Sequence, residues 1–117
     1  MGAEQEELVD SGRMAELASL GDPSLVRVVV DIFFNTVPDQ VRELREAAAR
    51  GDAGGVRTAG HTIKGGAASA GFPALSQVAA AIEDAGRDGR TEHFADLITK
   101  LDDLIGRTRA AVEAELA

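Results

Sequence analysis

One histidine in this sequence stands among residues suited to phosphoryl chemistry. His61 is followed one helical turn later by Lys64 and then by the adjacent pair Gly65 and Gly66. An exposed imidazole is a nucleophile at neutral pH, and a cation on the same helix face can offset the roughly two negative charges of a phosphoryl group. The two glycines leave the surface beside the ring low. This pattern predicts a phosphoryl-accepting histidine that a partner's active site can close over.

The elements that must position this histidine are helical. Apolar residues recur at three- and four-residue steps through most of the chain, and no segment alternates as a strand would. Gly51 and Gly71 mark helix ends, Gly86 is expected to end the next helix, and Thr91 is a suitable N-cap for the last. Helices are expected at about 10–20, 24–50, 53–70, 73–86 and 92–115. They predict an all-α fold, an antiparallel up-down four-helix bundle with a short additional N-terminal helix.

The segment 24–50 is the longest of these. Its apolar positions stay in phase through Pro38, which favours one helix bent there, although two helices joined at Pro38 remain possible. The expected apolar positions are Leu25, Val28, Val29, Ile32, Phe33, Val37, Val41, Leu44 and Ala48.

The segment 53–70 orients the histidine. Ile63 lies two residues, or about 200° of helix, from His61, so burial of Ile63 would turn His61 toward solvent. Glu83 follows His61 by 22 residues and lies about as far beyond the turn near Gly71 as His61 lies before it. In an antiparallel helix pair the two residues could therefore face each other.

The stretch from His61 to Phe72 resembles the histidine phosphotransfer (HPt) family. It carries His-x-aliphatic-Lys-Gly, then small residues, a glycine ten residues after the histidine, and an apolar residue. The resemblance implies that His61 is the phosphoacceptor and Lys64 stabilises the phosphoryl charge. It also implies that Glu83 accepts a hydrogen bond from Nδ1–H, which leaves Nε2 as the nucleophile. Gly65 and Gly66 would give a partner access.

The resemblance implies a carrier, not an enzyme, that moves a phosphoryl group between receiver-domain aspartates. Its partners would be response-regulator receiver domains and a hybrid sensor histidine kinase. It would need no cofactor or metal of its own, because the receiver supplies Mg²⁺. The chain has no glycine-rich nucleotide-binding region, so we expect no phosphorylation from ATP without a kinase. An alternative is the phosphotransfer domain of a chemotaxis-type histidine kinase, phosphorylated in trans; another is a helical interaction module with an incidental histidine.

Composition excludes several other classes of function. The net charge of −8 argues against nucleic-acid binding, and the absence of cysteine excludes disulfides and thiolate metal sites. The most apolar stretch, Leu25 to Phe34, is interrupted by charges and too short to span a membrane. We therefore expect a cytoplasmic monomer, with residues 1–9 a flexible N-terminus and residues 10–117 the domain.

The sequence offers further candidates for contact with a partner around the site. Met14 and Leu17 on the first helix are expected to be exposed and to contribute to docking around His61, together with positions near Gly65 and Ala68. A metal site using His61 and His93 lacks further ligands at suitable spacing, so His93 is expected to be a surface residue. Plainer roles remain open: Lys64 and Glu83 as solvated charges, the two glycines as packing contacts.

Overall fold

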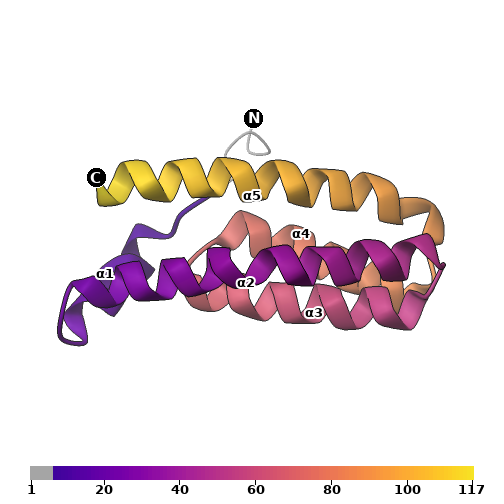
Figure 1. Ribbon diagram of the computed structural model, residues 1–117, viewed down its shortest axis with the longest axis horizontal. Helices are drawn as coiled ribbons and strands as arrows, with labels where there is room; N and C mark the ends of the chain where they lie inside the picture. The colour runs from indigo at the N-terminus through magenta and orange to yellow at the C-terminus, as the bar shows by residue number, and fades with distance from the viewer. Residues whose placement is uncertain (1–6) are drawn as a thin grey trace.

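The computed structural model describes residues 7–117, which form an elongated bundle of 43 × 32 × 19 Å. In Figure 1 the long helices run along the same axis, and a short helix near the N-terminus lies beside the start of the next one. The helices are α1 (Ser11–Ser19), α2 (Ser24–Ala49), α3 (Ala53–Ala70), α4 (Pro73–Asp88) and α5 (Phe94–Leu116). The predicted all-α fold is confirmed. In residues 7–117, no helix combines the length and apolar character needed to cross a membrane.

The helix that carries His61 has well-defined ends. The Asp52 side chain accepts a hydrogen bond from the Gly55 backbone N–H at 2.9 Å, which satisfies one free donor at the start of α3. Gly71, with a φ of 85°, ends the helix in the left-handed conformation that glycine adopts without strain. The preceding helix α2 continues through Pro38 without a break, as the in-phase pattern predicted.

Two predicted helix boundaries near the end of α4 are wrong. Gly86 does not end this helix; α4 continues to Asp88, and Gly89, with a φ of 69°, ends it. Gly86 is buried instead, where its missing side chain allows close packing. Thr91 does not cap the last helix either. Residues Thr91–His93 form a 3₁₀ turn, η2, in which the His93 N–H donates to the Arg90 carbonyl, and α5 begins at Phe94.

The core lies between the long helices and includes a cluster of three phenylalanine rings. Phe33 packs edge-on against Phe34 and Phe72, with ring centroids 5.1 Å apart in both pairs. The expected core face of α2 is partly wrong, because Val28 and Ile32 are exposed while Val26, Val30 and Phe34 are buried. This half of α2 is apolar on nearly every side, so periodicity did not identify the buried face.

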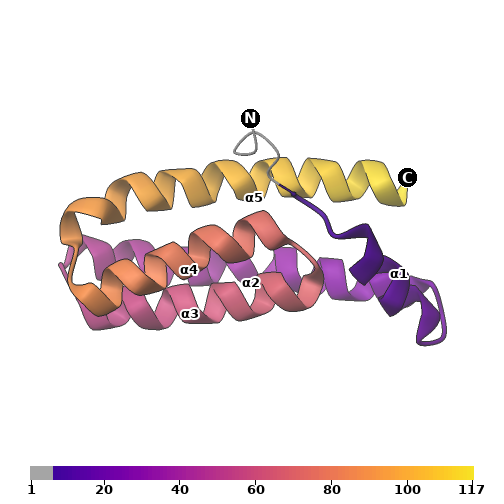
Figure 2. The same cartoon turned by 180° about the vertical axis from the view of Figure 1, so that it is seen from behind.

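The N-terminal helix covers one end of the bundle (Figures 1 and 2). Met14 and Leu17 are buried in the core, so the prediction that they form an exposed docking surface is wrong. A short helix has only one apolar face, and in this protein that face packs against the core of the bundle. Residues 1–6 of the predicted flexible N-terminus lie outside the described residues, whereas the Glu7 carbonyl accepts a hydrogen bond from the Ala74 N–H at 2.9 Å.

Candidate functional site

His61 projects from α3 into solvent. Its side chain is 69% exposed, whereas Ile63, on the opposite side of the helix, is completely buried. Burial of Ile63 and the neighbouring Ala67 fixes the rotation of α3 about its axis. The imidazole is therefore held on a rigid helix but remains open to a partner.

Glu83 on α4 lies directly beside this ring. One carboxylate oxygen, Oε2, is 2.9 Å from His61 Nδ1, and the other, Oε1, is 2.6 Å from Lys64 Nζ. The Glu83 side chain is only 11% exposed, and both of these contacts are partly buried. The structure thus brings together the three charged or titratable residues that the sequence singled out.

The ionisation state of Glu83 determines which ring nitrogen of His61 carries the proton. The Lys64 ammonium, hydrogen-bonded to the Glu83 carboxylate, lowers the pKa of Glu83; burial opposes this shift, and the hydrogen bond from His61 adds to it. The carboxylate is therefore ionised at neutral pH and can only accept hydrogen bonds. It follows that Nδ1 carries the proton and donates to Oε2. The lone pair of a neutral ring is then on Nε2, the nitrogen that Glu83 does not contact.

Lys64 is less free than the sequence suggested. It lies one turn along α3 from His61, as expected, but its ammonium is paired with Glu83. The side chain is 35% exposed, and an ammonium has three donors, of which the ion pair needs one. Lys64 can therefore keep Glu83 as a partner and still donate to an anion bound at His61.

Gly65 and Gly66 leave the surface next to His61 without side chains. A Cβ placed on Gly65 would have no neighbour within 4 Å, and one on Gly66 would be in ordinary contact with the Phe33 ring at 3.7 Å. Neither glycine is required by close packing of the backbone. This removes the packing explanation that the sequence left open for them.

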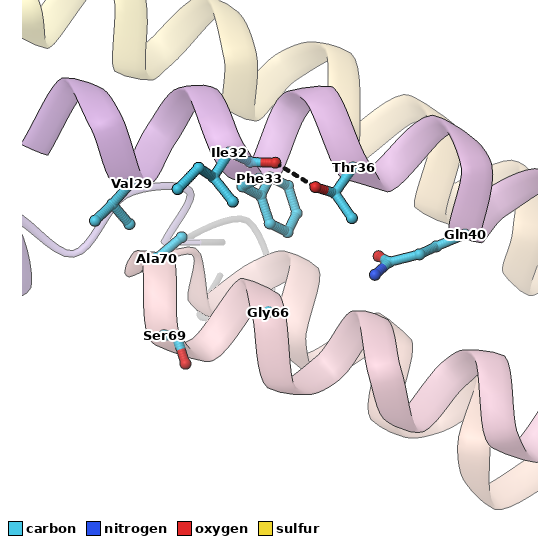
Figure 3. Close-up of a pocket in the computed structure, with 8 residues that line it drawn as sticks. All are labelled: Val29, Ile32, Phe33, Thr36, Gln40, Gly66, Ser69 and Ala70. Carbon is cyan, nitrogen blue, oxygen red and sulfur yellow. Dashed lines mark hydrogen bonds between the residues drawn. The ribbon is translucent and has the colours of Figure 1, made fainter.

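A groove between α2 and α3 begins at Gly66 and has a volume of about 220 Å³ (Figure 3). Figure 3 shows the Phe33 ring and Ile32 on the α2 side, facing Gly66 and Ala70 across the groove. Ile32 is 60% exposed, which is unusual for a large aliphatic side chain. The full lining is Val29, Ile32, Phe33, Thr36, Gln40, Gly66, Ser69 and Ala70.

The sequence pattern did not predict this surface, because its periodicity placed Ile32 in the core. The signal that could have found it is the surplus of apolar residues in Leu25–Phe34, which exceeds what one buried helix face can hold. Ile32 and Val28 lie one turn apart on the exposed side of α2, and Ile32 lines the groove together with Gly66. They replace Met14 and Leu17 as candidates for partner contact.

The described residues contain no group of three or more His, Cys, Asp or Glu side chains placed to hold a metal ion. His93 is exposed near the start of α5, and its Nε2 lies 3.8 Å from a Glu92 carboxylate oxygen. The expectation that His93 is a surface residue is confirmed.

Three solved structures share this fold. Histidine-containing phosphotransfer protein B from Pseudomonas aeruginosa PAO1 superposes with a TM-score of 0.84 at 24% identity, covering 92% of both chains. Histidine-containing phosphotransfer protein MtHPt2 from Medicago truncatula gives 0.81 at 16% identity, covering 96% of this chain and 78% of that one. The histidine-containing phosphotransfer domain of ArcB from Escherichia coli gives 0.70 at 23% identity, covering 92% and 98%.

A comparison with curated proteins finds no match. Comparison with protein families, in contrast, matches residues 28–111 to the Hpt domain. That range is well over half of the chain and includes His61, Lys64 and Glu83. The chain therefore belongs to the Hpt domain family, the histidine phosphotransfer carriers of two-component phosphorelays.

Proposed function

We propose that Nε2 of His61 is the atom that carries the phosphoryl group, between aspartates of response-regulator receiver domains. The observation that supports this is the hydrogen bond from His61 Nδ1 to the ionised Glu83, because it leaves Nε2 as the free nucleophile on a ring that is 69% exposed. Positioning and charge stabilisation supply most of the catalysis in phosphoryl transfer. A rigid, correctly protonated imidazole meets the first of these needs.

The transfer step balances with the groups present. Nε2 attacks the phosphorus of a receiver's aspartyl phosphate, an N–P bond forms, and the P–O bond breaks so that the aspartate leaves as a carboxylate. The proton stays on Nδ1, and the positive charge that the ring acquires faces the Glu83 carboxylate. In the next step an aspartate oxygen of a second receiver attacks phosphorus, and the N–P electron pair returns to Nε2.

The remaining charge is on the phosphoryl oxygens. Lys64 is placed to donate to one of them while it keeps its ion pair with Glu83. The Mg²⁺ ion used by receiver active sites is expected to come with the receiver, so this chain contributes the nucleophile and a docking surface. A hybrid sensor histidine kinase would supply the phosphorylated receiver, and we expect the chain to work as a cytoplasmic monomer without kinase activity of its own.

The receiver is expected to cover the α2–α3 groove as well as His61. A standard protein interface covers about 800 Å² on each partner, a patch roughly 30 Å across. Gly66 lies five residues after His61, about 7.5 Å along the helix. A partner centred on Nε2 therefore reaches the groove, and Ile32 is the exposed apolar side chain it would bury there.

The test is phosphotransfer from a receiver domain labelled with radioactive acetyl phosphate. The wild-type chain should acquire label that is labile in acid and stable in base, as a phosphoramidate is. His61→Gln should acquire none. His93→Gln is the matched control, because His93 is also an exposed histidine, and it should be labelled like the wild type. Labelling of His61→Gln at the wild-type level would refute the proposal.

A further inference from the structure

The two helices that form the site approach each other unusually closely at one glycine. Gly60 is buried in the middle of α3, facing α4. A Cβ placed on it would lie 2.8 Å from the Glu83 backbone nitrogen and 3.1 Å from the Ala79 carbonyl oxygen. The shorter of these distances is below what real Cβ atoms adopt, and both neighbours are backbone atoms that cannot rotate away. Any side chain at position 60 would therefore push α4 away.

A second glycine makes the reciprocal contact one turn along the pair. Gly86 on α4 faces the backbone of α3, and a Cβ there would lie 2.5 Å from the Arg57 nitrogen and 2.8 Å from the Ala53 carbonyl oxygen. Glycine in a helix interior costs up to about 1 kcal/mol relative to alanine. Both glycines therefore lower the helix propensity of their segments but allow the backbones of the two helices to approach closely.

The two contacts differ in which residue's backbone the glycine meets. Gly86 touches the backbone of Arg57, whose side chain points to solvent. Gly60 touches the backbone of Glu83 itself and is the residue immediately before His61. The contact at Gly60 therefore sets how far the Glu83 carboxylate extends toward the ring. The hydrogen bond it supports is 2.9 Å long, and such a bond is largely lost beyond about 3.5 Å.

We propose that Gly60 is a positioning residue for the phosphoacceptor. By lacking a side chain it brings the Glu83 backbone close enough for the carboxylate to hold His61 Nδ1–H, and so keeps the proton off Nε2. The effect on phosphotransfer rests on the function proposed above for His61. The effect on the imidazole proton does not, and it can be measured without any partner.

The experiment compares Gly60→Ala with Gly86→Ala in the full chain. Both substitutions add one methyl group to the contact between α3 and α4, but only the methyl group at position 60 lies against the Glu83 backbone; the one at position 86 lies against the Arg57 backbone. The tautomer of His61 is read from its ring nitrogens by ¹⁵N NMR, and His93→Gln assigns the signals because the chain has two histidines. We expect the Nδ1–H form in the wild type and Gly86→Ala, and a mixture with the Nε2–H form in Gly60→Ala.

Transfer from the acetyl phosphate-labelled receiver is the second measurement. We expect the initial rate to fall about tenfold in Gly60→Ala, the loss typical of removing a group that orients a reactive ring. Gly86→Ala should lose less. A Gly60→Ala protein that keeps the wild-type tautomer would overturn the inference. If the wild type is not labelled at all, the proposed function fails, but the comparison of tautomers still stands.

Glu83→Asp tests the same idea without disturbing the helix contact, in case Gly60→Ala does not fold. This substitution withdraws the carboxylate by one methylene, about 1.5 Å, and leaves the backbone of α4 in place. We expect the same shift toward the Nε2–H tautomer. If Glu83→Asp retains the wild-type tautomer, the reach of the carboxylate is not critical, and the role assigned to Gly60 is wrong.

Discussion

The two flanks of α3 are packed in opposite ways. On the flank that meets α4, Gly60 and Gly86 bring the helix backbones into direct contact, and Glu83 fills the space beside His61. On the flank that meets α2, a Cβ placed on Gly66 would only be in ordinary contact with the Phe33 ring at 3.7 Å, one on Gly65 would have no neighbour within 4 Å, and a groove remains open. Glycine serves close packing on the first flank and leaves empty surface on the second.

This difference separates two requirements of a phosphoryl carrier. The imidazole must be held in one tautomer and orientation, which favours a tight contact with few ways to relax. The partner must approach and leave, which favours a low and partly apolar surface. In this protein α3 meets the first requirement with one flank and the second with the other, so mutations on the two flanks should have separable effects.

The largest effect is expected on the closed flank, from Glu83→Ala. Loss of the acceptor for Nδ1–H should slow phosphotransfer about 10- to 100-fold, as removal of an orienting partner does elsewhere. Glu83→Gln is the matched variant, because its amide oxygen can still accept the hydrogen bond, and it should retain most of the rate. Stopped-flow transfer from a phosphorylated receiver measures both. Equal rates for Glu83→Ala and the wild type would remove the orienting role.

The next largest effect is expected on the open flank, from Ile32→Asp. If the receiver buries this side chain, its dissociation constant should rise about 30-fold, the equivalent of about 2 kcal/mol for an interface anchor. The rate at saturating receiver should be little changed, since the site itself is intact. Leu20→Asp is the control, because Leu20 is 72% exposed but lies outside the groove. Titration calorimetry with a receiver would contradict the docking surface if the two variants bound alike.

Alanine substitutions on the two flanks should change the free energy of unfolding in opposite directions. Gly60→Ala forces two backbones apart and should lower the free energy of unfolding by about 1–3 kcal/mol. Gly65→Ala meets nothing and removes a helix-interior glycine, so it should raise that free energy by about 0.5–1 kcal/mol. Urea unfolding followed by circular dichroism measures both. Destabilisation by Gly65→Ala would show that the open flank is more tightly packed than the structure indicates.

The smallest effect is a pH dependence that belongs to the closed flank. The pKa of Glu83 is lowered below its ordinary value of 4.5, mainly by the hydrogen bond from Lys64. A lowered folded-state pKa means that the ion pair stabilises the protein fully above the unfolded value and loses this effect as pH falls through the folded value. The stability of the wild type relative to Glu83→Gln should therefore decline below about pH 4.5. A constant difference from pH 7 to pH 3 would contradict this.

Much of the fold could be predicted from the sequence because helix periodicity and helix ends are local properties. The long helix through Pro38, the end of α3 at Gly71 and the outward direction of His61 opposite Ile63 each depend on residues within a few turns. The pairing of His61 with Glu83 was also accessible, since a short turn between two antiparallel helices brings residues equidistant from it together.

Other features depended on which surfaces meet in the folded chain. In Leu25–Phe34 nearly every helix face is apolar, so only packing against α1, α3 and α5 could bury Phe34 and leave Ile32 exposed. Gly86 resembles a helix stop in the sequence, and its actual role against the Arg57 backbone appears only when α3 lies beside it. Local composition sets which conformations a segment prefers, whereas close approach and exposure depend on residues distant in the chain, and these are brought together only when the whole bundle forms.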